Sequence, residues 1–163
     1  MSHQPVIDGF EFASAGAAQQ GILPLKEFPR LRDLLASDAG EVAYEIEGTR
    51  DERGRPGLRL KVRGALQLRC QRCLEPMAYE VEADSFLVLA ATQAEIDAEA
   101  GQVEGPDRVL GGRDMRVAEL VEDELILALP YAPRHEHCAG ATVEGEGRRS
   151  PFAGLRGLMR STH

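Results

Sequence analysis

The sequence contains no tryptophan, and aromatic residues make up only 5% of its 163 residues. A folded core therefore has to be built mainly from aliphatic side chains. No apolar run approaches the roughly 20 residues that a membrane span requires. The first residues lack the cationic start and the apolar block of a signal peptide. We therefore expect a cytoplasmic protein that has no membrane partner.

Cysteine is also scarce, with three residues in the whole chain. An odd and small number argues against a disulfide framework and favours a reducing compartment, where cysteines serve as ligands or thiols. Basic residues are outnumbered, with 19 Lys and Arg against 27 Asp and Glu, which gives a formal net charge of −8. This balance excludes a wholly basic nucleic-acid coat and a binder of anionic membranes, but it leaves room for a local basic stripe.

Alternation of apolar and polar residues predicts three long strands. Period-two patterns cover residues 42–46 and 58–70, and a third covers residues 77–91. The second strand is expected to bend or bulge near Gly64. The alternation of the third strand slips by one position, which predicts a bulge at residues 84–85.

Apolar residues at helical spacing predict two helices. A short helix is expected over residues 29–36, with Pro29 at its first position. A longer helix is expected over residues 115–129, capped by Asp114 and ended by Pro130.

These elements predict one α+β domain, in which a curled antiparallel sheet or small open barrel of four to six strands packs against one main helix. The domain spans residues 22–138 and contains an acidic loop over residues 92–113 with one short extended piece. Residues 1–21 are expected to form a flexible N-terminal arm. Residues 139–163 are expected to form a flexible C-terminal tail with a short terminal helix.

Two pairs of metal-ligating residues have the same spacing. Cys70 and Cys73 lie where one long strand turns into the next, and His135 and Cys138 follow the main helix. Together they predict a tetrahedral Cys₃His site for one structural Zn²⁺ ion, in which His137 competes for the fourth position. Such a closed site is structural, because a catalytic zinc keeps one position open for water.

Two other interpretations of the cysteines stay open. They are packed or idle thiols, or Cys70 and Cys73 form a redox pair. A thioredoxin-like pair requires a helix N-terminus, where the helix dipole lowers the thiol pKa, whereas residues 74–76 do not resemble a helix start. The redox interpretation is therefore the weakest of the three.

A basic stripe occupies residues 53–72, which contain seven basic residues and no acidic one. Such a stripe can follow a phosphate backbone, so the candidate RNA-binding residues are Arg59, Lys61, Arg63, Arg69 and Arg72. The competing interpretation is cross-strand pairing with glutamates and an aspartate of the neighbouring strands. Aromatic residues for base stacking are missing from the stripe, which favours pairing.

The main helix carries an acidic cluster, and the C-terminal segment carries a short apolar pattern. Paired carboxylates can perform acid–base chemistry or hold magnesium, but no nucleophile, phosphate loop or H-E-x-x-H motif accompanies them. A solvated face or a docking surface for a basic partner is the better interpretation. The candidate partner-binding residues are Glu119, Glu122, Asp123, Phe152 and Leu155. No catalytic residue and no small-molecule substrate are predicted.

Four segments, residues 68–77, 121–130, 133–138 and 151–155, carry a family resemblance. They contain L-R-C-Q-R-C-L-E-P-M, V-E-D-E-L-I-L-A-L-P, P-R-H-E-H-C and P-F-A-x-L. In this order and spacing they resemble the bacterial YceD family, whose members are called large ribosomal RNA subunit accumulation proteins.

The resemblance implies a cytoplasmic, non-enzymatic factor for the accumulation or processing of 23S rRNA. Its partner would be rRNA itself, or a ribosomal or rRNA-processing protein. The alternative is a zinc-stabilised protein-interaction module without direct RNA contact. Salt dependence separates the two, because phosphate binding weakens steeply as salt rises.

Overall fold

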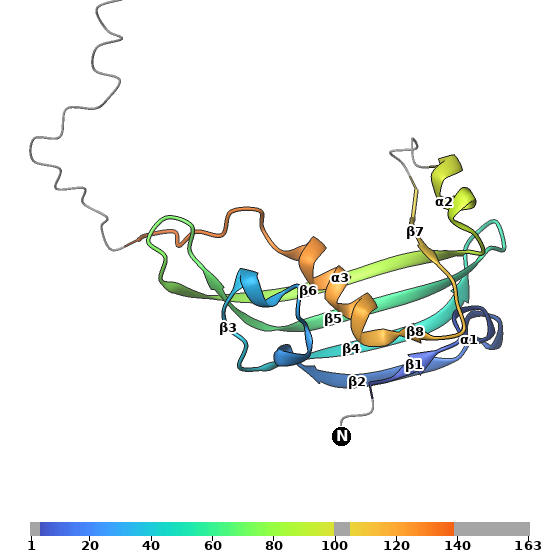
Figure 1. The fold of residues 1–163 in the computed structure, drawn as a ribbon, viewed down its shortest axis with the longest axis horizontal. Helices are drawn as coiled ribbons and strands as arrows, with labels where there is room; N and C mark the ends of the chain where they lie inside the picture. The colour runs from blue at the N-terminus through green and yellow to red at the C-terminus, as the bar shows by residue number, and fades with distance from the viewer. Residues whose placement is uncertain (1–3, 100–104, 139–163) are drawn as a thin grey trace, which may run out of the picture.

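The fold is built on a strongly curved six-stranded sheet, seen in a computed structural model that describes residues 4–99 and 105–138. Five strands lie side by side in the order β2 (Ala18–Pro24), β4 (Glu41–Arg50), β5 (Pro56–Arg69), β6 (Pro76–Ala90) and β7 (Asp107–Leu110). The sixth strand, β3 (Leu35–Ser37), lies outside this order and pairs with β5. All pairs are antiparallel except β6–β7, which is parallel. The sheet is open and curls around one helix (Figure 1).

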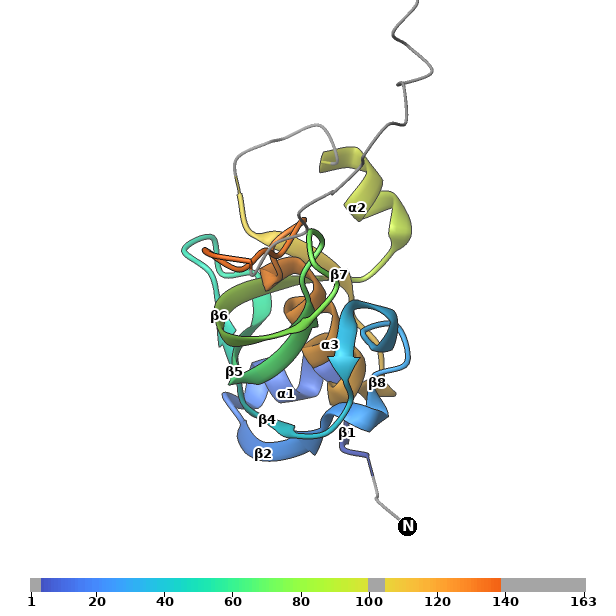
Figure 2. The same cartoon turned by 90° about the vertical axis from the view of Figure 1, so that its left-hand side faces the viewer.

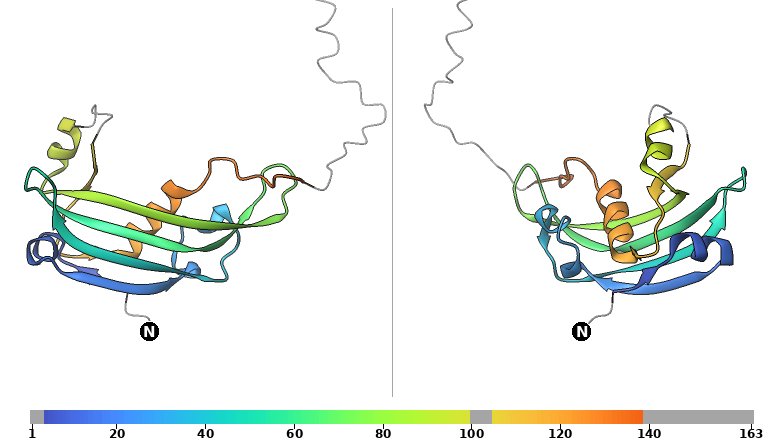
Figure 3. Two further views of the ribbon diagram at one scale, coloured as in Figure 1. Left: turned by 180° about the vertical axis from the view of Figure 1, so that it is seen from behind. Right: turned by 45° about the vertical axis from the view of Figure 1, so that its right-hand side comes forward.

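The remaining elements lie on the inner side and at the ends of this sheet. They are the helices α1 (Gly9–Ala15), α2 (Gln93–Glu99) and α3 (Val117–Ala128), the 3₁₀ turns η1 (Leu25–Glu27) and η2 (Arg32–Leu34), and a two-stranded ribbon of β1 (Val6–Ile7) and β8 (Met115–Arg116). Helix α3 lies in the hollow of the curved sheet (Figures 2 and 3). The predicted α+β class, with a curled open sheet around one main helix, is thereby confirmed.

The core fills the space between the inner face of the sheet and α3. Alternate residues of β4 and β5 point inward and are buried, and so is one face of α3. The largest contributors include Ile46, Leu58, Leu60, Leu66 and Leu125, each less than 2% exposed. Burial of apolar surface at roughly 25 cal/mol per Å² is the main term that holds the helix in the sheet.

Neither of the two predicted bulges is present, although the register does not contradict the bend expected as the alternative at Gly64. The β5–β6 register runs without a shift from Gly57 opposite Val88 to Arg69 opposite Pro76, and β4–β5 pairing continues to Gly64. The hydrophobic pattern of β6 changes because its last residues are buried on both faces, where β7 pairs with its edge. Gly64 serves a close approach between strands, because a Cβ there would lie 2.7 Å from Cγ1 of Val42.

Residues 4–21 are ordered elements rather than the predicted flexible arm. Helix α1 begins where the Asp8 carboxylate accepts the backbone N–H of Glu11, and it ends at Gly16 in the left-handed conformation. Ile7 and Ala13 are buried in the core. The pattern Asp-x-x-Glu before this helix and the glycine after it are the sequence signals that the prediction missed.

The helix predicted over residues 29–36 is also wrong, since this stretch contains only η2 and the start of β3. The main helix is confirmed, but it begins at Val117 and its N-cap is Arg116 rather than Asp114. The reason is that β8 holds the two preceding residues extended against β1, and Val117 donates its N–H to the carbonyl of Pro5.

The acidic stretch after β6 is more regular than a loop. Within its described residues it forms α2 and then β7, which contains the extended piece expected at residues 109–110. The predicted tail over 139–163, with its terminal helix and the candidate residues Phe152 and Leu155, lies outside the described residues. Within residues 4–99 and 105–138 no helix has the length and apolar character to cross a membrane.

Candidate functional site: a Cys₃His cluster

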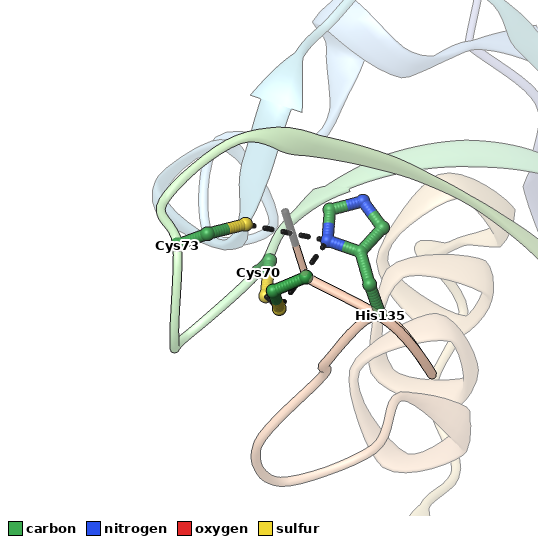
Figure 4. Close-up of side chains that lie close together, drawn as sticks. Cys70, Cys73 and His135 are labelled. Atoms are coloured by element: carbon green, nitrogen blue, oxygen red, sulfur yellow. Dashed lines mark hydrogen bonds between the residues drawn. The ribbon is translucent and has the colours of Figure 1, made fainter. Parts of the chain in front are cut away.

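The four predicted metal ligands come together at one end of the sheet. The ligand atoms of Cys70, Cys73, His135 and Cys138 all lie within 4.8 Å of one another. The Sγ atoms of Cys70 and Cys138 are 3.6 Å apart, and Nδ1 of His135 lies 3.3 Å from Sγ of Cys73 and 3.9 Å from Sγ of Cys138. Figure 4 shows Cys70, Cys73 and His135 pointing toward one another. This arrangement is compatible with a metal site.

Cys70 and Cys73 are held by the tight connection between β5 and β6. The backbone N–H of Cys70 donates to the carbonyl of Glu75, and the N–H of Leu74 donates to the carbonyl of Cys70. The turn closes because Leu74 adopts a φ of 65°, a conformation that non-glycine residues rarely take. The N–H of Arg72 points at the Cys70 sulfur at 3.4 Å. This geometry presents both thiols on the same side of the turn.

The other two ligands reach the cluster because the segment after α3 is bonded to this turn. The N–H of Gln71 donates to the carbonyl of Pro133 at 2.8 Å. Nε2 of His135 lies 3.2 Å from the carbonyl of Pro76, which can only accept, so Nε2 carries the proton and Nδ1 is left with its lone pair. Orientation of a ligand histidine by a backbone carbonyl is common at metal sites. His137 is exposed and is not a member of the cluster.

The thiols perturb one another. The backbone N–H of Cys73 and, against the effect of burial, those of His135 and Arg72 lower the pKa of Cys70 to about 5. The pKa of Cys73 is raised: the N–H of Glu75 lowers it, but burial and the neighbouring thiols of Cys70 and Cys138 outweigh that contribution. One thiolate thus makes the next one harder to form, and a cation is the partner that relieves this repulsion.

The basic stripe on β5 meets carboxylates on both neighbouring strands. Arg59 forms two hydrogen bonds of 2.9 Å with Asp84 on β6, and Arg63 pairs with Glu45 on β4 at 3.2 Å. Lys61 stands opposite Glu45 and Asp84 in the register. These contacts favour the pairing interpretation for the middle of the stripe.

The other two candidate RNA-binding residues lie beside the Cys/His cluster. Arg69 is the last residue of β5, and Arg72 lies between the two cysteines of the turn. Both side chains are exposed, and neither forms an ion pair within the described part of the chain. The five residues of the predicted stripe therefore fall into two different environments.

The acidic residues of the cluster on α3 also differ in their exposure. Glu119 and Asp123 are exposed, with side-chain exposures of 65% and 52%, whereas the side chain of Glu122 is only 4% exposed. The Glu122 carboxylate accepts hydrogen bonds from the backbone N–H groups of Arg30 and Leu31 and from Nε of Arg30. Asp123 binds the same guanidinium at 2.6 Å. Glu122 thus fixes the turn before η2 rather than facing a partner.

Glu124 has an internal role that the sequence did not reveal. It is buried, and it accepts a hydrogen bond from the hydroxyl of Ser85 on β6. Burial of two carboxylates that lie only two residues apart requires neighbouring elements on both sides of the helix. The only sequence signal for the internal role of Glu122 and Glu124 is their placement on a helix that is otherwise apolar on its inner face.

The fold and site together define a small α+β protein in which a Cys₃His cluster joins a sheet hairpin to the end of the main helix. The family model described as large ribosomal RNA subunit accumulation protein YceD matches residues 58–158. This match covers more than half of the chain, so the chain belongs to the YceD family. The match includes β5 except its first two residues, all of β6 and α3, and all four residues of the cluster. No solved structure matches this chain.

Family membership supports a general role in ribosome biogenesis, since the family is described by large-subunit rRNA accumulation. That description names no chemical reaction.

Proposed function

We propose that this protein is a non-enzymatic factor that promotes accumulation or processing of 23S rRNA in the cytoplasm. The observation that carries the proposal is the family match over residues 58–158. The fold agrees with it, because the conspicuous carboxylates of α3 are used inside the protein: Glu122 holds Arg30, and Glu124 holds Ser85. They are therefore not arranged as a pair of catalytic acids that face a substrate.

Deletion of the gene tests this proposal. The ratio of 23S to 16S rRNA should fall in the deletion strain, and precursors of 23S rRNA should change in amount. A plasmid copy of the wild-type gene should restore both. An unchanged ratio in the deletion strain would contradict the proposed function.

We further propose that the Cys/His cluster binds one structural Zn²⁺ ion. A tetrahedral zinc with Zn–S bonds of about 2.3 Å places its sulfur ligands about 3.8 Å apart. The 3.6 Å between Cys70 and Cys138 fits this spacing, and the remaining pairs need only small movements. The orientation of His135 by the carbonyl of Pro76 fits a nitrogen ligand. Zinc would crosslink the β5–β6 turn to the segment after α3.

Metal content and thiol reactivity test the zinc proposal together. Purified untagged protein should contain about one zinc per chain, because four protein ligands fill one tetrahedral site. A chelator should remove the ion and free the three thiols for titration. Absence of zinc together with freely reactive thiols would contradict the proposal and return the cluster to a packing or redox role.

The second candidate function is a zinc-stabilised protein-interaction module without RNA contact. The pairing of Arg59 with Asp84 and of Arg63 with Glu45 supports it, since phosphate binding there would have to break these contacts. A hollow of about 380 Å³ beside the exposed face of α3 offers a site for a basic partner. Its lining includes Gln4, Glu27, Arg30, Arg116, Glu119 and Asp123.

A double variant, Glu119→Lys with Asp123→Lys, distinguishes the protein-interaction function from the first proposed function. The double variant should abolish restoration of 23S rRNA if a basic protein docks on this face. Restoration at the wild-type level would remove these two residues from the function.

A further inference from the structure

The loops that carry the Cys/His cluster also carry three exposed arginines. Arg69 and Arg72 belong to the end of β5 and the turn that follows it, and Arg134 lies between Pro133 and His135 in the segment after α3. The hydrogen bond from Gln71 to Pro133 and the bond from His135 to Pro76 place the two segments side by side. Residues 62 or more positions apart in the sequence thus contribute to one basic surface.

These arginines differ from Arg59 and Arg63 in having no carboxylate partner among the described residues. Arg59 and Arg63, on the same strand as Arg69, are each bound to an acidic side chain of a neighbouring strand. Within residues 4–99 and 105–138, none of Arg69, Arg72 and Arg134 forms an ion pair. The exposed Glu75 and Glu136 lie on the same two loops, yet neither forms an ion pair in the described part of the chain.

An exposed aromatic side chain lies in the same segment as Arg134. Tyr131 lies three residues before Arg134 and is fully exposed, the most exposed large apolar or aromatic residue of the described chain. A free aromatic ring next to cationic side chains is the combination that single-stranded RNA recognition uses, because bases stack on the ring while the cations bind phosphates.

Charge is distributed unevenly along the molecule. The described loops at this end, residues 69–76 and 131–138, contain three arginines and two glutamates, so the negative net charge of the chain arises elsewhere. Helix α2, which contains Glu95 and Asp97, lies at the opposite end of the sheet from the β5–β6 turn (Figure 1). An overall acidic protein can therefore present a polyanion with a basic end and keep its acidic end away.

We propose that Arg69, Arg72, Arg134 and Tyr131 form an RNA-binding surface, here called the arginine surface, and that the Cys/His cluster holds its two halves together. The arginines bind phosphates and Tyr131 stacks on a base. This inference rests on the proposed function and specifies its partner as RNA. It also assigns the contact to the turn and the segment after α3 rather than to the middle of β5.

Two triple variants with equal loss of charge test the proposal. The first replaces Arg69, Arg72 and Arg134 by Gln. The matched control replaces Arg59, Lys61 and Arg63 by Gln. Binding of each full-length protein to a fluorescently labelled single-stranded RNA is measured by anisotropy at several salt concentrations, after circular dichroism and thermal melting have shown that both variants fold.

The arginine-surface variant should bind at least about tenfold more weakly than wild type. The slope of log K against log salt should become shallower by about 2, because three phosphate contacts on a single strand are lost. The control should bind within about threefold of wild type. Tyr131→Ala should weaken binding at all salt concentrations with little change in slope, and Tyr131→Phe should retain it, because stacking does not depend on the hydroxyl group.

Three results would overturn the proposal. A larger loss in the control would place the contact on the middle of β5. Equal affinity of the wild type and both variants would mean that these arginines do not bind RNA. Wild-type protein that does not bind RNA but captures an acidic protein through these arginines would make the surface a protein-docking site. Failure of the proposed function appears in the 23S rRNA of the deletion strain, which is a separate measurement.

Discussion

The carboxylate of Glu122 accepts a hydrogen bond from the backbone N–H of Leu31, which lies 91 positions away in the sequence. The same carboxylate accepts the N–H of Arg30 at 2.7 Å. A buried glutamate on α3 therefore supplies acceptors for a turn that has no regular secondary structure of its own. This contact places α3 and the segment before η2 in a fixed relation, and it explains why a charged side chain stands on the inner part of the helix.

Replacement of Glu122 by Ala should destabilise the fold. It leaves the N–H of the buried Leu31 without its acceptor and removes one of the two carboxylate partners of the Arg30 guanidinium, a loss of about 2–3 kcal/mol. For a domain of this size the melting temperature should fall by roughly 6–10 °C. Thermal unfolding followed by circular dichroism measures the change.

Glu119→Ala is the matched control on the same helix. Its side chain is 65% exposed and lies 3.7 Å from Arg116, so the change should stay within about 0.5 kcal/mol. Equal stability of the two variants would mean that the hydrogen bonds of Glu122 contribute no net stability.

Gly48 fixes the position of α1 against β4. A Cβ at this position would collide with the carbonyl oxygen of Phe12 and would lie 2.7 Å from Cα of Ala13, both backbone atoms of the helix. Gly48→Ala should therefore push α1 away and cost about 2–3 kcal/mol. Urea denaturation measures the loss, and amide hydrogen exchange should accelerate within α1.

Gly112→Ala provides the comparison, because nothing lies within 4 Å of its added Cβ. This variant should unfold at nearly the wild-type urea concentration. If both alanines had the same small effect, α1 would not pack against β4 through Gly48.

The Arg59–Asp84 pair makes a prediction about pH. The hydrogen bonds from Arg59 lower the pKa of Asp84, against the effect of burial, and the charges of Arg59 and Lys61 act in the same direction. A carboxyl whose pKa is lowered by folding stabilises the protein at pH values above its unfolded pKa. That contribution is lost as the pH falls through the folded pKa.

Arg59→Gln should raise the pKa of Asp84 toward its ordinary value, as followed by the carboxyl ¹³C shift in an NMR titration. Lys61→Gln should raise it less, because Lys61 acts through charge alone. A pKa of Asp84 that is the same in both variants and the wild type would contradict the pairing of the stripe.

Period-two patterns were sufficient to predict β4, β5 and β6, because each strand, apart from the doubly buried end of β6, has one face on the core and one in water. The spacing of Cys70–Cys73 and His135–Cys138 was sufficient to predict the cluster, because metal-ligating residue types at two matched turns have few other interpretations. The competing interpretation of the basic stripe was cross-strand pairing. The β5–β6 register and the pair of Arg59 with Asp84 agree with it.

The errors arose where distant segments determine local structure. Residues 4–21 contain few large apolar side chains, and they are ordered because β1 pairs with β8 and because β2 pairs with β4. The stretch at residues 29–36 has apolar residues at helical spacing, but the backbone N–H groups of Arg30 and Leu31 are bound by Glu122. Neither partner could be identified from the local sequence.

The two histidines that flank Glu136 should respond differently to the same substitution. Nδ1 of His135 lies among the sulfur atoms and its Nε2 is oriented by the carbonyl of Pro76, whereas His137 is exposed outside the cluster. His135→Asn should therefore lower the zinc content and reduce the melting temperature to that of chelator-treated wild type, because metal-binding energy contributes to folding. His137→Asn should retain about one zinc per chain and the wild-type melting temperature. Loss of zinc from the His137 variant alone would mean that the fourth ligand is His137 and not His135. Full zinc content in both variants would leave the three cysteines as the only protein ligands.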